Sequence, residues 1–314
     1  MRVRSLALAL LAGGILLFAA ASASAAGIVN GDFETGNLAG WLQHNSSPDG
    51  EWLTYQTSES AGFFPPPQGN WAALTEEGDP DTAILYQEVA LPPYSTSILS
   101  LTVYYKSDAP IVVPNPNTLL TGPGATFDNQ QLRVDVTKPT APIESVAAED
   151  ILATPFANAN GDPEIMAPKT VTADLSAFAG QTVRLRLANA INDSYFNAGV
   201  DDVTLTSALI NTFTHGKLTK KNGSAIMTVT VPGPGIVKLV SAGKKGKPKP
   251  IKALTKNPAA PGKVKLSLKP TGWGKKMLEE KGKLPFKLQL TYEPTGGTAT
   301  KQTLSGKLKL TGKH

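Results

Sequence analysis

The chain has 314 residues and no cysteine, so neither disulfides nor thiolate metal sites can stabilise it. Its net charge of +5 conceals a division. Residues 27–210 hold six basic and 22 acidic residues, a net charge of −16, whereas residues 211–314 hold 22 lysines, no arginine and three glutamates, a net charge of +19. A change of charge this sharp indicates two domains.

The N-terminus has the order of a secretory signal peptide. Arg2 and Arg4 precede an uncharged apolar run over residues 6–20, and small residues fill positions 21–26. We therefore expect a signal peptide over residues 1–26 and a secreted, extracellular protein that could associate with a cell wall. A membrane anchor is the alternative, but the run is short for a span, and no second apolar segment of spanning length follows.

The next part of the chain is predicted to form an all-β sandwich. Short apolar stretches alternate with clusters of Gly, Pro, Asn and Asp, which is typical of many short strands separated by turns. The expected strands are residues 84–89, 98–105, 131–136, 182–187 and 200–205. One turn of helix is expected over residues 174–180.

Several motifs of this part are similar to those of the galactose-binding-like jelly rolls used as carbohydrate-binding modules. They are an opening strand NGDFETGNLAGW (30–41), strands GNWAAL (69–74) and LYQEV (85–89), and closing strands within 174–185 and 199–205. The resemblance implies a jelly-roll β-sandwich over residues 27–208. It also implies a non-catalytic glycan-binding function, with a polysaccharide or cell-wall glycan as the partner.

The same resemblance implies a structural calcium ion (Ca²⁺) where the first and last strands meet. Asp32 and Glu34 lie on the expected first strand, and Asp201 and Asp202 lie on the last. Calcium binds hard oxygen ligands such as carboxylates, and two adjacent aspartates are unusual in a strand. The alternative is that all four are solvated surface acids.

Sugar binding would need exposed aromatic rings, because pyranose faces stack on them, with polar side chains around the rim. Tyr104 and Tyr105 are adjacent on a strand, so one should face outward. The long loop over residues 107–129 could shape a binding rim, or it could simply be mobile. The predicted ligand-binding rings are Trp52, Tyr55, Tyr105, Tyr195 and Phe196, chosen over the alternative that such rings belong to the core.

Residues 209–314 are predicted to form a smaller Ig-like β-sandwich. Lys or Thr alternates with Val, Leu or Ile over residues 225–231, 235–240, 263–269, 286–292 and 304–310, as in strands with one buried face. A short helix is expected over residues 271–282. The segment resembles lysine-rich β modules that follow other domains in secreted actinobacterial proteins, in TVTVPGPG (228–235) and KPTG (269–272).

Catalysis is not expected, because the chain has no phosphate loop, no G-x-S-x-G elbow and no metal-ligand spacing among its three histidines. Two alternatives stay open: a structural or adhesive envelope protein, and a glycoside hydrolase with a carboxylate pair. The lysines could be solvated, or could contact anionic envelope polymers or the acidic domain. Nucleic acid is not expected, since arginine is absent from the basic domain and few aromatics are interleaved.

Overall fold

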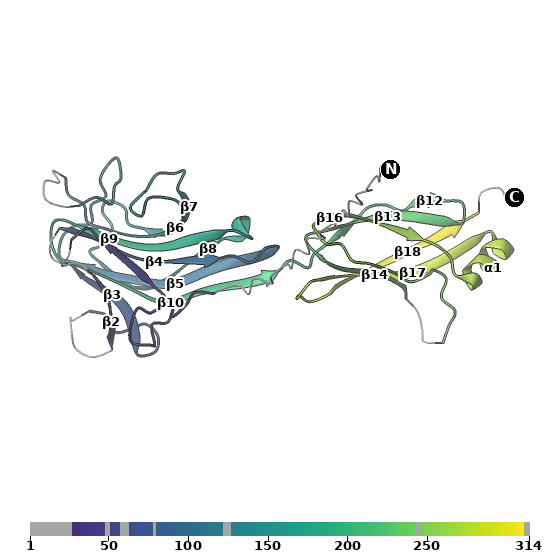
Figure 1. Ribbon diagram of the computed structural model, residues 1–314, viewed down its shortest axis with the longest axis horizontal. Helices are drawn as coiled ribbons and strands as arrows, with labels where there is room; N and C mark the ends of the chain where they lie inside the picture. The colour runs from purple at the N-terminus through teal and green to yellow at the C-terminus, as the bar shows by residue number, and fades with distance from the viewer. Residues whose placement is uncertain are drawn as a thin grey trace, which may run out of the picture.

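The computed structural model describes residues 27–47, 51–56, 63–77, 80–121, 127–242 and 246–310. The predicted signal peptide lies outside these ranges. Within them, no helix is long and apolar enough to span a membrane. The chain forms two β-sandwiches arranged end to end, the first built from β1 to β10 and the second from β11 to β18 (Figure 1).

The first sandwich consists of two five-stranded antiparallel sheets. One has the order β1 (Leu42–Asn45), β4 (Asp81–Ala90), β9 (Thr182–Ile191), β6 (Gln131–Thr137) and β7 (Ile151–Ala157). The other has the order β2 (Trp52–Gln56), β3 (Trp71–Glu77), β10 (Phe196–Leu209), β5 (Ser95–Ser107) and β8 (Ile165–Asp174). A short 3-10 helix, Ser176–Phe178, precedes β9.

These elements confirm the all-β prediction, since the five expected strands lie within β4, β5, β6, β9 and β10. The predicted opening strand is wrong. Residues 30–41 form consecutive turns, because Asn30 and Phe33 adopt φ values of 50° and 53° and Gly36 and Gly40 also have positive φ. The segment still reaches the last strand, as the Val203 N–H donates to the Gly31 carbonyl over 2.8 Å.

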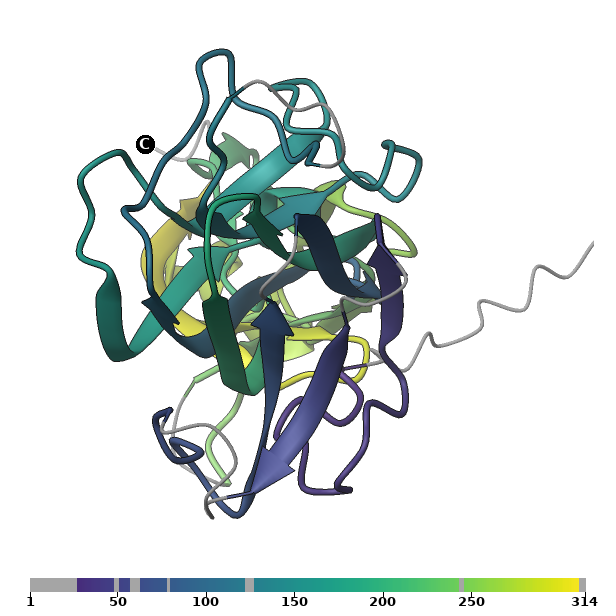
Figure 2. The same ribbon diagram turned by 90° about the vertical axis from the view of Figure 1, so that its left-hand side faces the viewer.

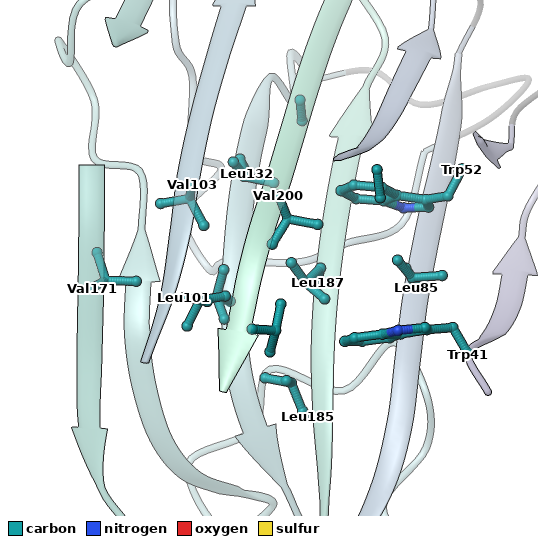
Figure 3. Packing of buried hydrophobic residues seen from close by; sticks show 14 of the residues in the cluster. Trp41, Trp52, Leu85, Leu101, Val103, Leu132, Val171, Leu185, Leu187 and Val200 are labelled. Atoms are coloured by element: carbon teal, nitrogen blue, oxygen red, sulfur yellow. The ribbon is translucent and has the colours of Figure 1, made fainter. Parts of the chain in front are cut away.

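The core of this sandwich lies between the two sheets and includes the buried rings of Trp41 and Trp52. Figure 3 shows the rings of Trp41 and Trp52 on either side of Leu85, with Leu187 and Val200 close by. The Trp52 indole N–H donates to the Ala83 carbonyl over 3.1 Å, so the buried ring leaves no polar atom unpaired.

Charged residues are buried on the outer side of the first sheet. Arg186 and Asp135 are both 0% exposed, and Arg186 Nη2 lies 2.6 Å from Asp135 Oδ2. Arg186 Nη1 also donates to the carbonyls of Ile143 and Ser145, over 2.7 and 2.8 Å. The arginine therefore fastens the loop after β6 onto the sheet face, and this is why two charges can be buried there.

The second sandwich also has two antiparallel sheets. In one, β13 (Ser224–Val231) pairs with β11 (Thr214–His215), β12 (Thr219–Lys221) and β16 (Gly262–Leu268). The other has the order β15 (Leu254–Lys256), β14 (Gly235–Ser241), β17 (Lys283–Pro294) and β18 (Thr300–Lys309). Buried aliphatic side chains and Tyr292 fill the space between them. The five expected strands correspond to β13, β14, β16, β17 and β18, although the expected ranges run one residue beyond the ends of β16 and β18.

The predicted helix of the second sandwich is confirmed as α1 (Gly272–Lys281). The Thr271 side chain accepts a hydrogen bond from the Gly274 N–H over 3.0 Å, which is the N-cap arrangement that starts a helix. The helix ends at Gly282, whose φ of 66° is the left-handed conformation that glycine adopts without strain.

The two sandwiches touch where β10 ends. The Ile210 N–H donates to the Tyr94 carbonyl over 2.9 Å, and the Asn211 side chain donates to the Thr298 carbonyl over 3.2 Å. The Tyr94 ring also packs against Gly233, at a point where any side chain would collide with it. Loops of the first sandwich occupy the opposite end, which faces the viewer in Figure 2.

Candidate functional site

A pocket of about 410 Å³ lies beyond the end of β5. Because β5 begins beside Tyr94, where the two sandwiches touch, the pocket is at the opposite end of the first sandwich. It lies in the connection from β5 to β6, and we call it the rim pocket. Its volume falls within the range usual for small-molecule sites. The lining residues are Val112, Pro114, Asn115, Pro116, Asn117, Thr118, Phe127 and Asp128.

An isolated β-bridge between Val112 and Gln130 closes this connection, with backbone hydrogen bonds of 3.1 and 2.8 Å. The bridge brings the segment before the pocket next to the segment after it. The buried Gln131 side chain then donates to Asn117 Oδ1 and to the Thr118 carbonyl, over 3.1 and 3.0 Å. Hydrogen bonds from a buried amide side chain therefore fix the position of the pocket wall.

Two exposed aromatic residues lie on loops joined by Asn192. Phe127 is 41% exposed and Tyr195 is 64% exposed. Asn192 donates from its side chain to the Phe127 carbonyl over 2.6 Å, and its Oδ1 accepts from the Asn129 N–H over 2.7 Å. The loop that carries Phe127 is thus fixed to the loop that carries Tyr195.

The pocket combines an exposed ring with amide and carboxylate groups. Asn115 and Asp128 are both exposed at its rim. An aromatic face, hydrogen-bonding amides and one carboxylate are the groups that recognise the apolar faces and hydroxyls of a sugar. Asp128 is the one acid among the described lining residues, so these residues do not include the pair of carboxylates that glycoside hydrolysis uses.

Four of the five predicted ligand-binding rings do not reach the surface. Trp52 and Tyr105 lie in the core between the sheets, with Phe196 edge-on to Tyr105 at 5.3 Å between centroids. Tyr55 lies on the outer side of the second sheet, but its hydroxyl is within 2.7 Å of Tyr104 and the ring is buried. None of these four can present a face to a sugar, and Tyr195 is left as the exposed candidate.

The reason for these corrections is that both faces of the second sheet are covered. Tyr105 points inward, and its hydroxyl donates to the Pro163 carbonyl over 2.8 Å. Tyr104 points outward, as expected for its neighbour on a strand, but Phe63 stacks on it at 5.3 Å and Phe64 meets it edge-on. Strand alternation therefore does not identify an exposed tyrosine here.

The predicted cation ligands lie where residues 30–41 meet β10. Glu34 Oε1 accepts hydrogen bonds from the N–H groups of Asn70 and Trp71, over 2.7 and 2.9 Å. Asp201 Oδ2 accepts from the Gln68 N–H over 2.9 Å. One short segment, residues 68–71, is therefore held by a carboxylate from the N-terminal segment of the first sandwich and by one from its last strand, β10.

Electrostatics differ between these carboxyl groups. Hydrogen bonds from the N–H groups of Trp71 and Asn70 lower the pKa of Glu34. Burial raises the pKa of Asp201 to about 6; the N–H groups of Gln68 and Asp202 oppose the shift, and the negative charges of Asp202 and Glu34 add to it. Asp201 is thus a buried acid whose charged form is disfavoured.

These residues do not form a cage of acidic ligands. Asp32 is exposed and makes a local contact, its Oδ1 lying 3.4 Å from the Glu34 nitrogen. Among the described residues, no group of three or more His, Asp or Glu side chains could hold a metal ion. Both oxygens of Asp201 already accept backbone N–H groups. Calcium binding by Asp32, Glu34, Asp201 and Asp202 stays a prediction.

No family model matches the chain, and no curated protein is similar to it in sequence. Solved structures to which the chain is similar include the K1 adhesin domain of Lys-gingipain from Porphyromonas gingivalis, at 15% identity and a TM-score of 0.35, with 56% of this chain and 95% of that chain covered. TmCBM61 in complex with β-1,4-galactotriose is similar at 12% identity and 0.34, with 56% and 94% covered.

The adhesin domain of Epf from Streptococcus pyogenes is similar over a longer part of the chain. It is 9% identical, with a TM-score of 0.38, and the match covers 87% of this chain and 93% of that chain. The similar structures thus include adhesin domains and carbohydrate-binding modules.

Proposed function

We propose that the chain is a secreted, non-catalytic glycan-binding protein that recognises sugars at the rim pocket. The observation that carries the proposal is the half-exposed Phe127 ring beside Asn115 and Asp128 in a pocket of sugar-binding size. The ring would stack on the apolar face of a pyranose, and the amide and carboxylate would hydrogen-bond to its hydroxyls.

Titration of the chain with neutral polysaccharides and their oligosaccharides, first on a glycan array and then by calorimetry, tests this proposal. Phe127→Ala should weaken binding roughly tenfold, which corresponds to about 1.4 kcal/mol and to the loss of one stacking ring. Leu120→Ala is the matched control. Leu120 is 59% exposed and lies in the same connection, but it does not line the pocket.

If Phe127→Ala and Leu120→Ala weaken sugar binding equally, the sugar binds outside the rim pocket. No binding to any polysaccharide would reject the glycan-binding proposal and favour a structural or adhesive role in the envelope. Tyr195→Ala, as a further variant, tells whether the bound glycan extends beyond the pocket to the neighbouring loop.

We also propose that a hard cation such as Ca²⁺ stabilises the corner formed by Glu34, Asp201 and Asp202. The support is chemical: the negative charges of Asp202 and Glu34 add to the raised pKa of the buried Asp201, and a bound cation would favour the charged form of that carboxyl group. The first sandwich should then melt at a higher temperature with calcium than with a chelator. An unchanged midpoint, in wild type and in Asp202→Asn alike, would reject a cation site here.

A further inference from the structure

The second sandwich has one sheet face whose charged side chains are almost all lysine. The registers of β14, β17 and β18 place outward residues directly opposite one another, with Thr291 between Lys238 and Lys301, and Lys283 opposite Lys309. Lys287 lies opposite Ser305, and Lys307 opposite Pro285, on the same side. We call this surface the lysine face; it comprises Lys238, Lys283, Lys287, Lys301, Lys307 and Lys309.

Charge on this face is not balanced. Its one acid, Glu293, lies 3.7 Å from Lys238. The other five lysines form no ion pair with any residue in the described ranges. A surface evolved only for solubility usually mixes both signs, so a field of one sign over a whole sheet face indicates attraction of an opposite charge.

Protection of the sheet edge explains only part of the pattern. Lysines on an edge strand prevent pairing with another chain, and β18 is an edge strand. However, β14 and β17 are interior strands. Lys238, Lys283 and Lys287 therefore protect no edge and need another explanation.

The pattern also has a cost. Lys283 and Lys309 are direct cross-strand neighbours, and like charges in that position destabilise a sheet. Uncharged side chains at either position would remove the repulsion without disturbing the core, because both residues are exposed. The presence of both lysines is consistent with a partner that neutralises them.

Spacing and side-chain type indicate the chemistry of that partner. Alternate residues on a strand are about 7 Å apart and neighbouring strands about 4.8 Å apart, so Lys283, Lys307 and Lys309 form a close group of ammonium charges. Lysine is a flexible point charge, without the rigid fork of arginine, and suits a chain of evenly repeated anions. We propose that the lysine face binds a linear polysaccharide carrying carboxylate or sulfate groups.

Two other occupants fit the face less well. Nucleic acid would gain from aromatic rings on which bases stack, but no aromatic residue is at an outward position of β14, β17 or β18. The acidic first sandwich of a second copy offers charge but no repeating linear array. Both occupants are outcomes that the experiment below separates.

The test measures binding of the whole chain to immobilised polygalacturonate, dextran sulfate and neutral dextran across a range of salt concentrations. The face variant carries Lys283→Gln, Lys287→Gln, Lys307→Gln and Lys309→Gln. The control variant carries Lys263→Gln, Lys265→Gln, Lys275→Gln and Lys281→Gln, which are exposed lysines on β16 and α1, so that both variants lose the same charge.

At low salt the face variant should bind the anionic polymers at least tenfold more weakly than wild type, and the control variant within threefold of it. The affinity of wild type falls as salt rises, and the magnitude of the slope of log affinity against log salt should be smaller by roughly 3 in the face variant, about 0.7 for each lysine removed. Comparison of polygalacturonate with dextran sulfate separates carboxylate from sulfate as the preferred group. The melting temperature of the face variant should not fall, since a repulsive pair is relieved.

Equal weakening in both variants would overturn the proposal, because it would mean diffuse attraction by net charge. Tighter binding of single-stranded DNA than of either polysaccharide would assign the face to nucleic acid and also overturn it. Self-association at low salt that the face variant abolishes would assign the face to a second copy. Neutral-glycan binding at the rim pocket should be unchanged in the face variant, so the two proposals can fail separately.

Discussion

Substitution of Asp135 by Asn should destabilise the first sandwich strongly. Asp135 is 0% exposed and accepts hydrogen bonds from Arg133, Arg186 and Thr154. The change leaves Arg186, itself fully buried, and Arg133, whose side chain is 11% exposed, without a counterion. Removing one partner of a buried ion pair costs about 3–5 kcal/mol. For a domain of this size, that corresponds to a lowering of the melting temperature by roughly 6–20 °C.

Differential scanning calorimetry of the whole chain is the assay, with the transition of the second sandwich as the internal reference. The matched control is Asp108→Asn, which removes an exposed carboxylate 3.9 Å from Lys106 and should change little. A shift of less than about 2 °C for Asp135→Asn would refute the reasoning, since it would show that the buried arginines do not need the carboxylate.

The effect of Asp135→Asn should depend on pH with a definite sign. Burial acts to raise the pKa of Asp135, but the hydrogen bonds and positive charges of Arg133 and Arg186 outweigh it, so the pKa lies below its usual value. The stabilisation is therefore present above the pKa of the unfolded chain, about 3.9, and is lost as pH falls through the folded value. The difference between wild type and the variant should shrink under acidic conditions.

Three further predictions concern single residues. Because the pKa of Asp201 is raised to about 6, the protonated carboxyl group stabilises the folded state, and this stabilisation is lost as pH rises through 6. The first sandwich should therefore melt on the order of 5 °C higher at pH 5 than at pH 7. Asp201→Asn should abolish the difference. Gly69→Ala should lower the melting temperature, because φ is 63° and a Cβ would collide with Glu34. Thr271→Ala should cost the second sandwich about 1 kcal/mol in denaturant unfolding, through loss of the α1 cap.

Interior strands were predictable because their apolar residues alternate or cluster, as in β5 and β13. Strands β7 and β8 are among those that were missed. Both lie at sheet edges and contain a proline, Pro155 or Pro168, which argues against a strand, and β8 is mostly exposed. The turns over residues 30–41 were missed because positive φ at Phe33 has no sequence signal comparable to that of glycine.

The candidate site was harder to predict than the fold. The sequence marks residues 107–129 as a long loop, and Phe127 as an aromatic within it, but it does not show that Asn115 and Asp128 line one pocket. Their placement depends on the bridge from Val112 to Gln130 and on buried amide contacts. The aromatic candidates failed for a related reason, since loop residues such as Phe63 cover a face that strand alternation would expose.

The end-to-end layout of the sandwiches bears on how the two proposed sites would act together. The rim pocket is at the far end of the first sandwich, and hydrogen bonds at Tyr94 and Asn211 join that sandwich to the second. A chain anchored by its lysine face would carry the pocket a full domain length away from the attachment point. Its two sites would therefore act as a short bridge between two polymers, held apart by at least the length of the first sandwich, which β10 spans.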